Sequence, residues 1–262
     1  MIAVGKIFIS LCPTPRISFV QATMAENSEQ LQQKALLAHE RFCATYGCPV
    51  KYFHTLDPIS ELVSSLLSHR TKNADSSRAF RNLRQQFPTW EAVLEAPLEE
   101  IQNAIAAATW PEQKAPRLQA VLKEVLVRNN NSFDLTFLKE LAVSEARAWL
   151  EQLPGVGPKT SAAVLLFSNL RMPAMPVDSH HHRVAQRLGL LPDKIGPGPA
   201  HTILEGLLPA NWDAQQVYDH HEVYMFHGQR CCFFQNPDCQ RCVVLDICPF
   251  GQRRMAKLKK QL

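Results

Sequence analysis

Five of the eight cysteines in this chain of 262 residues lie within eighteen residues near its C-terminal end. Such a crowded, odd-numbered set, in a chain without a clear secretion signal, indicates a metal or cluster site rather than a framework of disulfides. Four thiolates from one short loop can bind an iron–sulfur cluster or a zinc ion. The candidate ligands are separated by six, two and five residues: Cys232, Cys239, Cys242 and Cys248.

The rest of the chain has a helical pattern. Apolar residues recur at helical spacing over 29–46, and Asp57-Pro58 is typical of an N-cap followed by proline in the first turn. Few stretches look like strands, and the chain has only ten glycines. The sequence therefore predicts an all-α protein of many short helices. Further amphipathic segments are expected near 75–87, 91–106, 114–128 and 145–152.

Residues 153–160 read Leu-Pro-Gly-Val-Gly-Pro-Lys-Thr and stand before an apolar helix. Glycine reaches positive φ, so Gly155 and Gly157 can form a tight turn, and the first N–H groups of the next helix then point outward. A phosphate oxygen fits such a helix start, which makes Gly155, Val156 and Gly157 candidate contacts to a DNA backbone. A bare Gly-x-Gly would favour a plain helix-turn-helix joint with glycines for packing, but the full string is more specific.

This hairpin, the segment Pro176-Val177-Asp178-Ser179-His180 and the cysteine spacing together resemble the endonuclease III family of DNA glycosylases, over roughly residues 30–250. The resemblance implies that Lys159 is the nucleophile and Asp178 the catalytic carboxylate. It implies a partner, double-stranded DNA with a damaged base or an abasic site. It also implies a 4Fe–4S cluster on the four candidate cysteines, with Cys231 outside the set because it would break the six-residue gap. Zinc is the competing interpretation, although zinc ribbons generally use two Cys-x-x-Cys knuckles and this chain has one.

The chemistry of that family suits these residue types. A neutral amine at Lys159 can attack C1′ of the deoxyribose and displace the base, and the resulting Schiff base makes β-elimination of the 3′ phosphate easy. Because the amine must lose its proton near neutral pH, we expect a partly desolvated lysine. A carboxylate at Asp178 can stabilise the cationic sugar or take a proton. Taken singly, Lys159 can be a solvated helix residue or a phosphate contact, and Asp178 can be an N-cap for a helix at 180–188.

Removal of a base from a duplex requires the base to leave the stack and the gap to be filled. In the family one loop carries glutamine where this chain has Arg70, and a second loop carries an aliphatic residue where this chain has Trp110. We interpret both as side chains that enter the duplex, and His180 as a DNA or packing contact near the site. The alternatives are a surface role for Arg70 and core packing for Trp110. Neighbours on a helix point about 100° apart and cannot chelate together, so three adjacent histidines do not indicate a metal site. His181 and His182 are expected to be solvated or to face phosphate.

The resemblance further implies two all-α lobes with DNA in the cleft between them. One lobe is a six-helix barrel over 51–172 that ends in the helix–hairpin–helix. The other joins 29–50 to 173–250 and contains the cluster. Residues 1–28 are expected to form a disordered extension, and 251–262 a basic tail.

The function so implied is that of a bifunctional DNA glycosylase and AP lyase of base excision repair, which removes oxidised pyrimidines. An adenine-mismatch glycosylase would lack the lysine at 159 and carry a glutamate in the first loop, and neither fits. A redox carrier would need neither the hairpin nor the Lys–Asp pair. A DNA-binding paralogue with weak or monofunctional glycosylase activity stays open, because Arg70 and Trp110 depart from the family pattern.

Charge and the first residues of the chain are less informative. The net charge of +4 permits a nucleic-acid partner without requiring one. The apolar run from Ile7 to Leu11 is short and is followed by two prolines, so it supports a signal peptide only weakly. No apolar run is long enough to span a membrane. We expect a cytoplasmic monomer.

We predict that Cys242→Ser bleaches the brown colour of the protein and lowers its stability, because one of four cluster ligands is lost. The measurements are visible absorption, iron content and thermal unfolding. Cys231→Ser is the control, since Cys231 lies outside the expected ligand set. A colourless wild type loaded with zinc would contradict the cluster.

Overall fold

The computed structural model describes the backbone of residues 19–260 and the side chains of residues 27–260, and this part of the chain is helical without any strand. The all-α prediction is confirmed. None of the described helices is both long and apolar enough to cross a bilayer. The first eight helical elements are α1 (Phe19–Tyr46), α2 (Pro58–Ser68), α3 (Asn73–Gln86), α4 (Trp90–Glu95), α5 (Leu98–Ala104), α6 (Pro111–Arg128), η1 (Thr136–Glu140) and α7 (Val143–Leu150). The remaining elements are α8 (Pro158–Phe167), α9 (Ser179–Leu188), α10 (Pro197–Glu205), α11 (Ala214–Arg230), η2 (Cys239–Arg241), η3 (Leu245–Ile247) and α12 (Pro249–Lys259).

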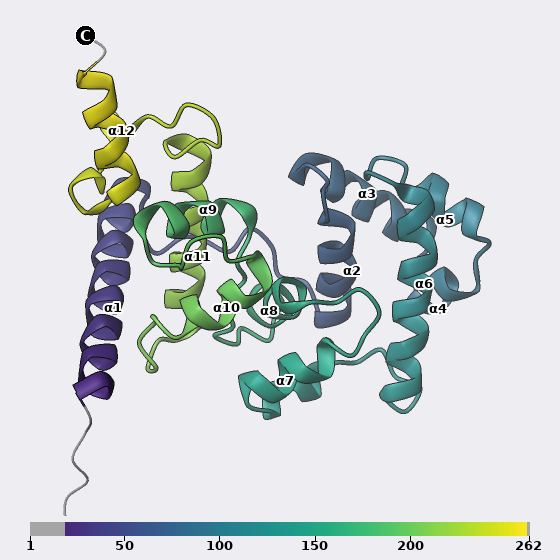
Figure 1. The fold of residues 1–262 in the computed structure, drawn as a ribbon. Coiled ribbons are helices and arrows are strands. Elements are labelled where there is room, and N and C mark those ends of the chain that lie inside the picture. The colour runs from purple at the N-terminus through teal and green to yellow at the C-terminus, as the bar shows by residue number, and fades with distance from the viewer. Residues whose placement is uncertain (1–18, 261–262) are drawn as a thin grey trace, which may run out of the picture.

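The helices enclose two hydrophobic cores, one for each lobe seen in Figure 1. The first core is built by α2–α8, and the second by α1 and α9–α11. Helix α8 contributes to both, because Leu165 packs in the first core and Leu166 in the second. A helix that is apolar on all sides must be covered on all sides, and α8 accordingly lies between the lobes (Figure 1).

Local signals explain where several helices begin and end. Asp57 caps α2 by accepting a hydrogen bond from the Ser60 N–H (2.9 Å), and Pro58 follows in the first turn, as the sequence predicts. The segment predicted as one helix near 91–106 is two helices, α4 and α5. Pro97 separates them because proline has no N–H to donate and disfavours helical backbone in the residue before it.

Two predicted boundaries fall inside helices. α1 begins at Phe19, so residues 19–28 of the expected disordered extension belong to this helix, while residues 1–18 lie outside the described residues. The expected basic tail is also helical as far as Lys259, because α12 begins at Pro249 and uses Cys248 as its N-cap. α12 packs against α9, so it is part of the second lobe.

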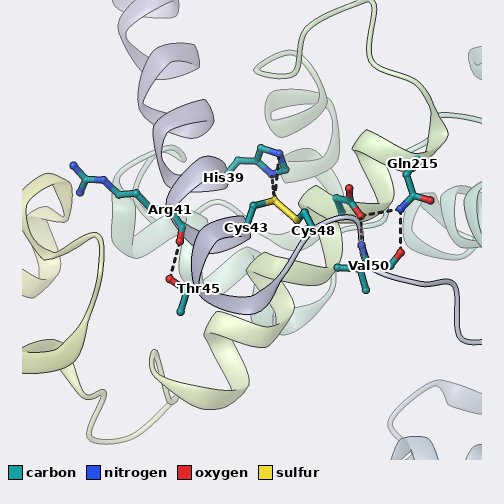
Figure 2. The surroundings of a disulfide bond; sticks show 8 residues. His39, Arg41, Cys43, Thr45, Cys48, Val50 and Gln215 are labelled. Atoms are coloured by element: carbon teal, nitrogen blue, oxygen red, sulfur yellow. Dashed lines mark hydrogen bonds between the residues drawn. A yellow bond between two sulfur atoms is a disulfide. The ribbon is translucent and has the colours of Figure 1, made fainter.

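Cys43 and Cys48, which the sequence left as scattered cysteines, form a disulfide at the end of α1. Figure 2 shows His39, one turn earlier on α1, with its Nε2 3.7 Å from the Cys43 sulfur. Just beyond the bridge, the Val50 N–H donates to Asp219 Oδ1 on α11 (2.8 Å). These contacts attach the end of α1 to the middle of the second lobe.

An ion pair between α7 and α10 also joins the lobes. Arg147 on α7 donates to Glu205 Oε1 at the end of α10 (2.7 Å), and the same oxygen accepts the Met175 N–H (3.1 Å). The Arg147 and Glu205 side chains are only 15% and 27% exposed. A partly buried, charge-assisted pair that also pairs a backbone N–H is one of the stronger polar contacts in a protein.

We predict that Glu205→Gln lowers the free energy of unfolding by about 1–3 kcal/mol, because it weakens bonds to a charged group and to a backbone N–H together. Chemical denaturation measures the change. The control is Glu124→Gln, which removes the more exposed ion pair with Arg128 on α6 and should cost no more than about 0.5 kcal/mol. Equal effects of the two substitutions would contradict the role of the Arg147–Glu205 pair.

Candidate active site and cysteine centre

A cleft of about 670 Å³ opens between the two lobes beside the start of α8. Residues from five separate segments line it: the first loop, after α2; the hairpin and start of α8; the start of α9; the start of α10; and the second half of α11. Six of the eight predicted catalytic and DNA-contacting residues are among them, namely Arg70, Gly155, Gly157, Lys159, Asp178 and His180. The fold thus brings together residues that are far apart in the sequence.

Of the two hairpin glycines, Gly155 has the positive φ that the sequence predicts, whereas Gly157 is in extended backbone (φ −116°) that any residue can adopt. Gly155 has φ +76°, and a Cβ there would meet the Arg117 side chain at 3.0 Å, so both the backbone and the space favour glycine. Gly157 is the N-cap residue of α8 and Pro158 is in its first turn. Val156 differs from its neighbours, because its side chain is buried in the first core. Only the backbone of Val156 is therefore available to a ligand.

Lys159 is exposed at the start of α8. The expectation of a partly desolvated lysine is therefore not met in the free protein. Lys159 borders the main cleft, and it also borders two adjoining cavities, of about 410 Å³ and 280 Å³. A ligand in any of these three spaces can therefore lie next to Lys159.

Asp178 has the structural role that was considered as an alternative, and it also faces the cleft. Its side chain accepts the His181 N–H (2.7 Å) as the N-cap of α9, which begins at Ser179. Burial opposes ionisation of Asp178, but nearby His221 and the bond from the His181 backbone outweigh it and keep the pKa of the carboxyl below its usual range. A carboxylate that stays ionised suits a site where positive charge develops.

The three consecutive histidines have different surroundings. His181 is fully buried, with its ring 4.7 Å from the Tyr224 ring, so the expectation that it is solvated is wrong. His182 Nε2 contacts the Ile195 carbonyl oxygen (3.0 Å). His180 borders the cleft, and its Nδ1 lies 3.0 Å from Arg183 Nη2. The three histidine side chains therefore have three separate sets of contacts.

Both loop residues predicted to enter the duplex adopt left-handed backbone conformations. Arg70 has φ 52° and Trp110 has φ 55°, which is uncommon for residues other than glycine. Trp110 is 46% exposed, so it is not a core residue. Arg70, Trp110 and Lys159 border the same 410 Å³ cavity.

Buried polar contacts fix the first loop. The Lys114 ammonium donates to the carbonyl oxygens of Leu67 (2.6 Å) and His69 (2.9 Å) and to Thr71 Oγ1 (2.7 Å). Burial lowers the pKa of Lys114 to about 8. The His69 ring also contacts Thr160 Oγ1 on α8 (2.9 Å). Lys114 and His69 therefore tie the loop of Arg70 to the helices that carry Trp110 and Lys159.

Sequence reasoning missed several polar residues that border the same region. Glu61, Glu222, His54 and His221 all border the 280 Å³ cavity that also contains Lys159 and Asp178. Burial raises the pKa of Glu61 to about 8 and that of Glu222 to about 7. The one available signal was an acidic residue inside the apolar segment 58–67, which becomes α2.

The five C-terminal cysteines border one small cavity between α9, the end of α11 and the start of α12. Cys232 Sγ accepts a hydrogen bond from Arg187 Nη1 (3.2 Å), and Cys248 Sγ accepts one from the Gly251 N–H (3.3 Å). Among the residues that the structure describes, one group has three ligand atoms within 4.8 Å of one another: His227, Cys231 and Cys242. The cavity is thus a Cys/His centre.

The chain is similar in sequence to known DNA repair proteins. A family model for the HhH-GPD superfamily of base excision DNA repair proteins matches residues 63–210, which is more than half of the chain. Endonuclease III of Thermotoga maritima is 30% identical over 199 residues, which cover 76% of this chain and 85% of that protein. The chain belongs to the endonuclease III family. Endonuclease III of Bacillus subtilis is also 30% identical, over 202 residues that cover 77% of the chain and 85% of the relative.

One further sequence relative and two solved structures are also similar to this chain. A longer protein of Arabidopsis thaliana, a proposed DNA glycosylase, is 33% identical over 170 residues, which cover 65% of this chain and 56% of that protein. The fold matches a trapped covalent intermediate of an endonuclease III with DNA, at a TM-score of 0.72 and 24% identity, over 86% of this chain and 98% of the other. A thermostable thymine-DNA glycosylase matches at a TM-score of 0.66 and 19% identity, over 88% and 99%. The fold of this chain is thus that of DNA glycosylases.

We predict that Lys114→Met lowers the free energy of unfolding by about 1–3 kcal/mol, because three buried acceptors lose their donor. Amide hydrogen exchange should quicken in residues 67–72 more than elsewhere. Lys123→Met, an exposed lysine on the same helix, is the control and should change neither quantity. Unchanged exchange in residues 67–72 of the Lys114 variant would show that the ammonium does not order this loop.

Proposed function

We propose that this chain is a bifunctional DNA glycosylase and AP lyase that removes oxidised pyrimidines and nicks the strand at the abasic site. Lys159 and Asp178, from different segments, border one cleft between two lobes, and this observation carries the proposal. The family membership gives the reaction class, and the relatives in Thermotoga maritima and Bacillus subtilis are named endonuclease III.

The proposed reaction begins with the Lys159 amine. The neutral Nζ attacks C1′, the bond from C1′ to the base breaks, and the base leaves with the electron pair and takes up a proton. The sugar ring then opens to a Schiff base between Lys159 and C1′. Loss of a proton from C2′ breaks the C3′–O bond, which releases the 3′ phosphate, and water finally frees the lysine.

The surroundings supply what this sequence of steps needs. Asp178, ionised on α9, stabilises the positive charge that develops on the sugar. Lys159 is exposed in the free protein, so bound DNA has to exclude water from its amine. The start of α8 provides an amide-rich end for a phosphate oxygen. Together these features position the sugar between the lobes.

Arg70 and Trp110 are placed to occupy the gap that a displaced base leaves. Both border the cavity beside Lys159, and both are exposed. Trp110 offers an aromatic face that can stack on neighbouring bases. Arg70 offers donors for the base left without a partner. His180 borders the cleft, where it can contact the DNA backbone.

The cysteine centre fits the 4Fe–4S cluster that the sequence indicates. Cys232, Cys239, Cys242 and Cys248 border one small cavity, and their sequence contains one Cys-x-x-Cys knuckle where zinc ribbons generally have two. Two of these thiols accept N–H bonds, as cluster thiolates do. Such a cluster would cross-link the loop after α11 to α12, and the proposed reaction needs no electron from it.

Borohydride trapping tests the proposal. The wild-type protein is incubated with a duplex that contains thymine glycol and, separately, with an abasic-site duplex, in the presence of borohydride. A covalent adduct with both duplexes is the expected result, because borohydride reduces the Schiff base to a stable amine. A brown protein that binds the duplex but forms no adduct with either substrate would favour the DNA-binding paralogue.

We predict that Lys159→Ala loses the adduct and at least about 10³-fold of the nicking rate, because no other amine replaces the nucleophile. The variant should still bind duplex DNA, since the hairpin and both loops are intact. A gel-shift measurement checks binding and strand cleavage checks the rate. Retained nicking by Lys159→Ala would rule out Lys159 as the nucleophile.

A further inference from the structure

The 280 Å³ cavity beside Lys159 and Asp178 has the character of a pocket for a flat, polar ring. Two aromatic side chains border it: Phe53, which is 65% exposed, and Phe167, whose ring lies 5.8 Å from that of Phe53. Exposed aromatic rings provide a stacking face for a nucleobase. The adjacency to Lys159 means that a base that leaves the duplex stack can enter this pocket while its sugar stays at the amine.

One wall of this pocket contains two buried polar atoms without hydrogen-bond partners, Glu61 Oε2 and His54 Nδ1. Glu61 is 3% exposed, and its other oxygen, Oε1, accepts from Ser65 Oγ (2.9 Å). His54 Nε2 lies 3.3 Å from Glu61 Oε2. Buried polar atoms are rarely left unpaired, because each costs free energy, so an unpaired donor and acceptor in one pocket point to a ligand that pairs them.

Burial fixes the charge and polarity of this wall. It raises the pKa of Glu61 to about 8 against smaller opposing effects of Ser65 and Arg171, and it lowers the pKa of His54. Both groups are then neutral at pH 7. The acid proton of Glu61 faces His54 Nε2, so the ring carries its own proton on Nδ1. The wall accordingly offers an N–H donor from His54 beside a lone pair on Glu61 Oε2.

We propose that the Glu61–His54 pair reads the edge of the displaced base and selects bases with a carbonyl next to a ring N–H, uracil-type lesions over cytosine-type lesions. This inference rests on the proposed function and names its substrate class. A uracil-type edge presents an acceptor to His54 Nδ1–H and a donor to Glu61 Oε2. A cytosine-type edge presents an amino donor and an unprotonated ring nitrogen, which reverses both partners. Sites that pair a substrate by hydrogen bonds reject analogues that leave buried groups unpaired.

The test compares two substrates that differ only in this edge, duplexes with 5-hydroxyuracil and with 5-hydroxycytosine. Base release is measured by alkali cleavage, which does not require the lyase step, and an abasic-site duplex measures the lyase step alone. We expect the wild type to release 5-hydroxyuracil at least about tenfold faster. Glu61→Leu should bring this ratio close to one, while cleavage of the abasic site changes less than twofold.

Two further variants separate recognition from stability. Glu61→Gln keeps the size of the side chain and a donor toward His54 Nε2, but it presents an N–H where Glu61 Oε2 offers a lone pair, so it should also lower the preference. Glu61→Leu also removes the acceptor of the buried Ser65 hydroxyl, so thermal unfolding is measured for each variant to separate a loss of preference from a loss of stability. Val63→Ala on the same helix, buried in the first core, is the control that lowers stability and should leave the preference unchanged.

Three outcomes would contradict base reading by Glu61 and His54. Equal release of the two bases by the wild type, release of neither, or an unchanged preference in Glu61→Leu would overturn the inference. Loss of abasic-site cleavage by the wild type, with selective base release intact, would instead overturn the lyase half of the proposed function and leave the base-reading pair in place.

Discussion

The packing of α8 between two hydrophobic cores is the interaction on which the rest of the structure depends. Leu165 and Leu166 are adjacent, yet they face different cores, so neither lobe is complete without this helix. Because α8 is enclosed, its exposed N-terminal end is fixed relative to both lobes. Lys159 lies at that end, and Asp178 begins α9 on the other lobe. The same apolar contacts that stabilise the fold thus set the position of Lys159, the proposed nucleophile, against the Asp178 carboxylate.

Features that cost stability gather around that point. Arg70 and Trp110 adopt left-handed backbone conformations, and Glu61 and His54 contain unpaired buried atoms. Each is unfavourable for folding alone, and proteins concentrate such features where a ligand compensates for them. Left-handed backbone conformations also occur away from the cleft, at Asn130 and Asn131 for example. The region around the cleft differs in combining them with unpaired buried atoms.

Burial and charge act in opposite directions on the acidic groups of the site. Burial dominates at Glu61 and Glu222 and raises the pKa of both. At Asp178 the neighbouring His221 and the backbone bond from His181 outweigh burial, and the pKa falls. Two kinds of carboxyl group therefore border one cavity: Asp178, which stays ionised, and Glu61 and Glu222, whose protonated forms burial favours. A cationic transition state and a neutral ring need those two environments.

The sequence by itself determined the all-α fold, the hairpin with its glycine turn, and the identity of Lys159, Asp178 and the candidate cysteine ligands as one family pattern. These are local signals, since spacing, caps and turn residues act over a few positions. Only the tertiary structure decided that Val156 and His181 are buried, that Cys43 pairs with Cys48, and that His54 meets Glu61. Contacts of that kind depend on which helix faces which, and the pattern along a single helix does not contain that information.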